Sequence, residues 1–154
     1  MNWSRKIMLA ALLLPCLVVS TPASAKSDRL AVVIANGNYT NVGALANPVS
    51  DGRLVAESLR ASGFEVVVYE NLGEQGIRNA SRDIAKKSPG YDATLVYYAG
   101  HGVQISGINY LLPVDLTPPE VEDDIKLTSI SADDLVAAIK SPYKVLVLDA
   151  CRDN

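Results

Sequence analysis

Two side chains in this sequence have the chemistry of a nucleophile and its base. His101 is the only histidine, and Cys151 is the only cysteine after residue 25. A thiol needs a base or an electropositive neighbour to attack near neutral pH, and one histidine within reach is the usual solution. Taken singly, the alternatives are a surface histidine and an inert buried cysteine. Together, the two residues predict nucleophilic catalysis.

Glycines flank this histidine in the segment Gly100-His101-Gly102. Because they carry no side-chain bulk, a substrate backbone can approach closely, and the Gly102 N–H stays available. We expect this N–H and the Cys151 N–H to stabilise an oxyanion in the transition state.

Alternating strands and helices must position these residues. The continuous apolar run of residues 30–35 predicts a strand buried on both faces, and residues 64–69, 93–99 and 144–148 predict three further strands. The spacing of apolar residues predicts helices at 48–62 and 74–87, and a Ser131-Ala132-Asp133-Asp134 capping box opens another, ending near Lys140. Residues 107–112 predict a short hairpin arm, and residues 115–128 an acidic loop.

This order of elements predicts an α/β fold with an open, mostly parallel sheet and helices on both faces. Ligands bind such sheets beyond the carboxyl ends of the strands. His101 follows the third strand and Cys151 follows the fourth. If these strands are neighbours, both side chains emerge at the same end of the sheet. Asn154 comes just past the fourth strand, so we expect residues 26–154 to be the N-terminal part of a longer domain, with little or no turnover alone.

The first 25 residues have the pattern of a secretory signal peptide. A basic start at Arg5 and Lys6 precedes a short apolar run, and small residues follow at Ala23 and Ala25. The run is shorter than the roughly 20 residues that span a bilayer. We therefore expect cleavage after Ala25, no stable membrane anchor afterwards, and a periplasmic or extracellular location. A retained membrane anchor is the alternative.

The composition narrows the classes of partner. Among 154 residues, 14 are basic and 17 acidic, giving a formal charge of −3. No basic stripe is present to neutralise phosphates, so nucleic acid is not an expected partner.

Two motifs resemble the catalytic motifs of caspase-like cysteine peptidases, most closely the bacterial, metacaspase-like members. They are residues 97–102, Tyr-Tyr-Ala-Gly-His-Gly, and residues 149–154, Asp-Ala-Cys-Arg-Asp-Asn. Their His and Cys stand about 50 residues apart, as in caspases. The resemblance begins near Arg29 and includes Asn36-Gly37-Asn38-Tyr39 and residues 109–115. It implies a caspase-like fold and hydrolysis of polypeptide substrates.

The resemblance also implies roles for individual residues. Cys151 would attack the scissile carbonyl, and His101 would handle the proton for the leaving amine. In metacaspases, aspartates at the positions of Asp51 and Asp149 line the pocket for a basic P1 side chain, which two carboxylates suit by charge pairing. Animal caspases have an arginine shortly before the first of these positions, where residues 43–47 here contain no cation. The alternatives are a helix N-terminal carboxylate for Asp51 and a strand-end hydrogen bond for Asp149.

Calcium is a weaker expectation. Some metacaspases are activated by calcium through acidic residues in a region comparable to the acidic loop, where Asp115, Asp123 and Asp124 are the candidates. Oxygen clusters suit calcium, but a charge run is usually a solvated face, and no other cofactor is expected.

The sequence thus favours an exported cysteine endopeptidase that cleaves after Arg or Lys. A non-catalytic caspase-like module that binds or regulates a partner is the alternative. A flavodoxin-like ligand-binding domain would need a phosphate-binding turn, for which Asn36-Gly37-Asn38-Tyr39 is poorly suited.

Overall fold

The computed structural model describes residues 27–118, 121–150 and 152–153, with side chains up to residue 150. The predicted signal peptide, residues 1–25, and Cys151 lie outside the described residues. Within the described part of the chain, no helix is long and apolar enough to cross a membrane.

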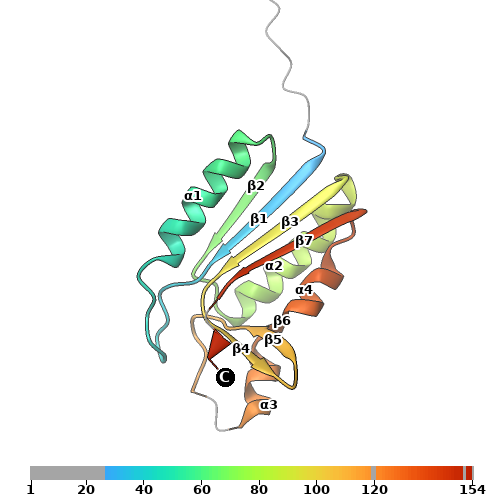
Figure 1. Cartoon of the computed structure of the whole chain (residues 1–154). Helices are drawn as coiled ribbons and strands as arrows, with labels where there is room; N and C mark the ends of the chain where they lie inside the picture. Colours follow the sequence, from blue (N-terminus) through green and yellow to red (C-terminus); the bar gives the residue numbers. More distant parts are fainter. Residues whose placement is uncertain (1–26, 119–120, 151, 154) are drawn as a thin grey trace, which may run out of the picture.

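A four-stranded parallel sheet forms the centre of the molecule (Figure 1). Its strands are β1 (Arg29–Ala35), β2 (Glu65–Glu70), β3 (Ala93–Ala99) and β7 (Tyr143–Asp149), in the order β2-β1-β3-β7. The four predicted strands are therefore confirmed, with bounds that differ by one residue at most. The apolar run of β1 is buried because both of its neighbours and helices on both faces cover it.

Helices cover both faces of this sheet, as predicted. Helix α1 (Pro48–Ala61) lies on one side, and α2 (Glu74–Lys87) and α4 (Ala132–Ala138) lie on the other (Figure 1). Ala56 of α1 packs with Val33 of β1, whereas the opposite core joins side chains of α2 and α4 to Val32 and Ile34. A short 3₁₀ turn, η1 (Ser88–Gly90), follows α2.

A second, smaller sheet lies beyond the carboxyl ends of the main strands (Figure 1). Its strands are β4 (Gly102–Ile105), β5 (Ile108–Leu111), β6 (Ile130–Ser131) and β8 (Arg152–Asp153), in the order β6-β5-β4-β8. The β4–β5 hairpin turns at Ser106 and Gly107, with φ of 53° and 84°. Positive φ at both central residues is what a tight hairpin turn requires. The predicted hairpin arm is thus one strand of a true hairpin.

The acidic segment 115–128 was predicted to be a loop, and this prediction is wrong for its second half. Helix α3 (Glu122–Thr128) forms there. The Asp124 carboxylate accepts a hydrogen bond from the Val121 N–H at 3.2 Å, and Lys126 pairs with Asp123 at 2.7 Å. Carboxylates in the first turn and a lysine three residues later both stabilise a helix. The charge run is therefore a helix start as well as a solvated surface.

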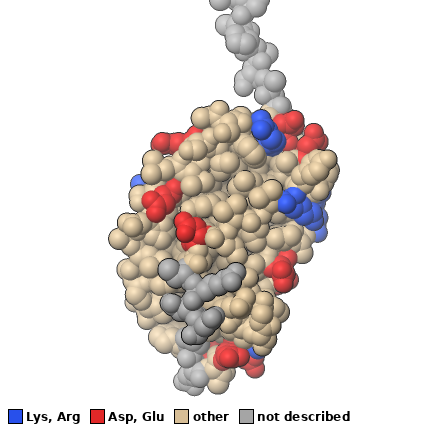
Figure 2. All heavy atoms as spheres, in the orientation of Figure 1, with Lys and Arg blue, Asp and Glu red and all other residues tan. Residues whose placement is uncertain are grey.

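The surface charges are dispersed on the face seen in Figure 2, which has the orientation of Figure 1. Acidic side chains lie at several separate places, and the basic ones form no continuous stripe among the described residues visible there.

Candidate active site

Strands β3 and β7 are parallel neighbours, so residues that follow the two strands lie at the same end of the sheet. Ala99 pairs with Asp149, and the Gly100 N–H donates to the Asp149 carbonyl at 3.3 Å. His101 and Ala150 therefore leave the sheet at the same end. Cys151 is outside the described residues, but the residues on both sides of it lie near Gly102. Arg152 pairs with Gly102 in the β4–β8 ladder, and a Cβ added at Gly102 would stand 3.3 Å from the Ala150 Cβ.

Two buried tyrosine hydroxyls hold the backbone of His101. Its N–H donates to the Tyr39 hydroxyl at 2.8 Å, and its carbonyl accepts from the Tyr98 hydroxyl at 2.6 Å. The two hydroxyls lie 3.3 Å apart. Burial raises the pKa of both Tyr39 and Tyr98, so each hydroxyl keeps its proton to donate. The backbone position of the candidate base is thus fixed from both sides.

The Asn36 side chain ties together the loops around these tyrosines. Its amide donates to the carbonyls of Leu72 and Leu112, at 3.3 and 3.2 Å, and its oxygen accepts from the Leu72 N–H at 2.8 Å. Asn36 is fully buried, so these bonds satisfy a group that would otherwise be costly to bury. The segment Asn36-Gly37-Asn38-Tyr39 therefore supports the histidine loop. The sequence signal that could have predicted this role of Asn36 is its position as a polar amide directly after a buried strand.

The orientation of the His101 ring follows from two contacts. The ring meets Tyr39 edge-on, with centroids 4.5 Å apart and an interplanar angle of 60°. Its Nε2 lies 2.7 Å from the carbonyl oxygen of Gly43. A carbonyl oxygen only accepts, so Nε2 carries a proton in this arrangement and Nδ1 is the acceptor nitrogen of the neutral ring. Nδ1 is therefore the atom that can take a proton from a thiol. A cavity of about 340 Å³ adjoins the ring.

The same two tyrosine hydroxyls leave no room for a side chain at Gly100. A Cβ at this position would lie 2.7 Å from the Tyr39 hydroxyl and 2.8 Å from the Tyr98 hydroxyl. We expect Gly100→Ala to lower the free energy of unfolding by about 1–3 kcal/mol, because the crowded hydroxyls must move. Gly43→Ala is the matched control, since a Cβ there meets nothing within 4 Å. Denaturant unfolding of both variants measures the difference. Equal midpoints would show that the tyrosine hydroxyls accommodate a Cβ at Gly100 without cost.

Asp51 and Asp149 line one cavity of about 280 Å³, together with Gly100, the loop residues 45–47 and Pro48 at the start of α1. Asp51 lies in the first turn of α1, and Asp149 is the last residue of β7. The structure therefore brings the two proposed P1 residues together. Their alternative roles are also present, since Asp51 is a helix N-terminal carboxylate and Asp149 accepts a hydrogen bond from Tyr97 at 2.8 Å.

The three calcium candidates each have a partner in the structure. Asp115 accepts from the Glu74 N–H at 2.9 Å and so caps α2. Asp123 pairs with Lys126, which lowers the pKa of its carboxyl group, and Asp124 caps α3. Across residues 27–118 and 121–150, no group of three or more His, Cys, Asp or Glu could hold a metal ion. A calcium requirement stays a prediction.

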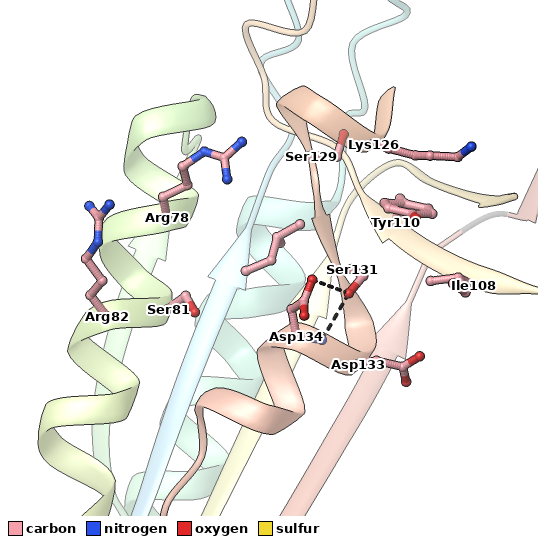
Figure 3. A pocket seen from close by; sticks show the side chains of 11 residues that line it. Arg78, Ser81, Arg82, Ile108, Tyr110, Lys126, Ser129, Ser131, Asp133 and Asp134 are labelled. Carbon is pink, nitrogen blue, oxygen red and sulfur yellow. Dashed lines mark hydrogen bonds between the residues drawn. The ribbon is translucent and has the colours of Figure 1, made fainter. Parts of the chain in front are cut away.

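A larger cavity, of about 610 Å³, lies between α2, β5 and the start of α4 (Figure 3). There the Ser131 hydroxyl donates to the Asp134 carboxylate at 2.7 Å and accepts from the Asp134 N–H at 3.0 Å. These bonds confirm the predicted start of α4. Arginines of α2 line the opposite side, but the lining contains no histidine or cysteine. This cavity therefore lacks the two residue types, histidine and cysteine, on which the predicted dyad depends.

The sequence is similar to known proteins over most of its length. The model of the family described as "Caspase domain" matches residues 28–154. The human mucosa-associated lymphoid tissue lymphoma translocation protein 1 is 31% identical over 126 residues, which are 81% of this chain and 15% of that protein. Caspase b of zebrafish is 30% identical over 139 residues, 87% of this chain and 33% of that protein. The chain thus spans a third or less of these relatives.

Proposed function

The chain belongs to the caspase family, and on that premise we propose that it is an exported cysteine endopeptidase that cleaves polypeptides after Arg or Lys. Membership of the family supports a cysteine-type peptidase and a polypeptide substrate in general terms. The observation that supports the proposed His101–Cys151 dyad is the parallel pairing of β3 with β7, which brings His101 and the residues beside Cys151 to one end of the sheet.

In the proposed mechanism, the Cys151 sulfur attacks the scissile carbonyl carbon while His101 Nδ1 accepts the thiol proton. The tetrahedral intermediate collapses to a thioester as His101 gives the proton to the leaving amine, and water then hydrolyses the thioester. The N–H groups of Gly102 and Cys151 would stabilise the oxyanion. The ring contact with Gly43 supports this proton path because it assigns the acceptor nitrogen.

The preference for a basic P1 side chain is proposed from the charge of the Asp51–Asp149 cavity. A guanidinium or ammonium would gain charge-assisted hydrogen bonds to carboxylates there. The loop that lines the cavity contributes Leu45, Ala46 and Asn47, so no cation of that loop offsets the negative charge. The test is cleavage of Arg-P1 and Lys-P1 peptides by the full-length protein. Failure to cleave either peptide, at any calcium concentration, would overturn the proposal.

Export has its own test. We expect mature protein recovered outside the cytoplasm to begin at Lys26, because the small residues Ala23 and Ala25 suit signal peptidase cleavage after Ala25. N-terminal sequencing of that protein measures this directly. A mature protein that still carries residues 1–25 would show that the segment is retained.

A further inference from the structure

Tyr97 lies beside the proposed P1 cavity without lining it. It belongs to the core on the α1 side of the sheet, with Val33 and Ala56, and is only 7% exposed. Its partner in the β7 register is Val147. Asp149 comes two residues later, on the same face and closer to the carboxyl end of the sheet. The Tyr97 hydroxyl crosses this diagonal and reaches Asp149 Oδ2 at 2.8 Å.

The direction of this hydrogen bond is fixed by chemistry. Burial raises the pKa of Tyr97 first, and the carboxylates of Asp149 and Asp51 raise it further, so the phenol keeps its proton. The phenol therefore donates and the carboxylate accepts. Asp149 is the last residue of β7, and its side chain is exposed among the described residues. Exposed side chains change rotamer readily. The hydrogen bond from a buried phenol to Oδ2 limits that rotation. It leaves Oδ1 and the second lone pair of Oδ2 for a ligand.

We propose that Tyr97 is a specificity-positioning residue, which holds the Asp149 carboxylate in the plane that a P1 guanidinium needs. This inference rests on the proposed function, because it presupposes that the Asp51–Asp149 cavity receives a basic side chain. Orientation matters more for arginine, whose planar fork binds a carboxylate through two fixed hydrogen bonds, than for lysine, whose ammonium acts as a point charge. Tyr97 should therefore favour arginine over lysine.

Binding of agmatine and cadaverine to the full-length protein tests this without requiring catalysis. The first carries the guanidinium of an arginine side chain and the second the ammonium of a lysine side chain. We expect Tyr97→Phe to weaken agmatine binding about tenfold, because binding must then also order the freed Asp149 side chain. Cadaverine binding should weaken less than about threefold, because a point charge tolerates a rotated carboxylate. Isothermal titration calorimetry measures both dissociation constants.

Tyr69→Phe is the matched control. The Tyr69 hydroxyl donates to Asp83 Oδ2 at 3.0 Å, so the change removes the same kind of bond between β2 and α2, and neither residue lines the cavity. We expect it to leave both dissociation constants unchanged. A second variant, Asp149→Glu, alters an exposed residue and so does not depend on the folding of a core variant. It keeps the charge but moves the carboxylate from the phenol, and should also lose the preference for agmatine.

The outcomes separate the inference from the proposed function. If Tyr97→Phe leaves agmatine binding unchanged, or weakens both amines equally, the positioning role is overturned while the pocket stands. A retained agmatine preference in Asp149→Glu would also overturn it. If the wild-type protein binds neither amine, the basic P1 pocket and the positioning role fall together. The role of Cys151 is then judged by labelling of its thiol, which does not depend on this cavity.

Discussion

Replacing either Cys151 or His101 by alanine should lower peptidase activity of the full-length protein by at least about 1000-fold, because nucleophile and base act as one unit. The double variant should be no worse than either single variant for the same reason. Turnover of an Arg-P1 peptide under substrate-limited conditions measures kcat/KM for all three proteins.

Folding controls accompany this comparison. The His101 side chain is only partly buried and its backbone is held by Tyr39 and Tyr98, so His101→Ala should keep a melting temperature close to that of the wild type. Substantial turnover in Cys151→Ala would refute the assignment of the nucleophile. Additive losses in the double variant would show that the two residues act independently.

The second large effect concerns specificity. The full-length protein should cleave Arg-P1 and Lys-P1 peptides and leave the matching Asp-P1 peptide uncut, because an aspartate placed beside Asp51 and Asp149 is repelled. Asp149→Asn should lower kcat/KM for the Arg-P1 peptide by roughly 30-fold or more, the cost of removing one partner of a charge pair that substrate binding desolvates. Asp133→Asn is the control, since Asp133 is exposed on α4 and does not line this cavity.

Thiol reactivity distinguishes a specificity defect from a catalytic one. The rate at which iodoacetamide alkylates Cys151 should be nearly the same in Asp149→Asn and the wild type, because a small uncharged reagent does not use the P1 cavity. A preference for Asp-P1 peptides would contradict the pocket assignment. So would Arg-P1 cleavage that survives both Asp51→Asn and Asp149→Asn.

The main sheet was predictable because short segments rich in apolar and β-branched residues favour strands. The first of them, residues 30–35, is a continuous apolar run and is buried in β1. Helix α3 was not predictable in the same way. It has no buried residue, so no periodic apolar face marks it. Its stability comes instead from a cap at Asp124 and a pair between Asp123 and Lys126, which look like a solvated charge run in the sequence.

In the candidate site, the positions of the functional residues were predictable, whereas their hydrogen-bond partners were not. The placement of His101, Asp51 and Asp149 at one end of the sheet followed from their positions at strand and helix ends. The tyrosine contacts did not, because Tyr39 and Tyr98 are 59 residues apart in the chain. The adjacent Tyr97 and Tyr98 point to opposite faces of β3, so one holds Asp149 and the other holds His101. The register of two strands, which no local pattern gives, decides which partner each hydroxyl meets.

Covalent labelling with a peptidyl-arginyl chloromethyl ketone tests the nucleophile and the specificity pocket together, because it requires both a reactive thiol and a basic P1 pocket. Mass spectrometry of the full-length protein should show one adduct, mapped to Cys151, that forms slowly in His101→Ala. The matching aspartyl reagent should label far more slowly. An adduct at another residue, no adduct, or equal rates for the two reagents would show that Cys151 is not a nucleophile served by a basic P1 pocket.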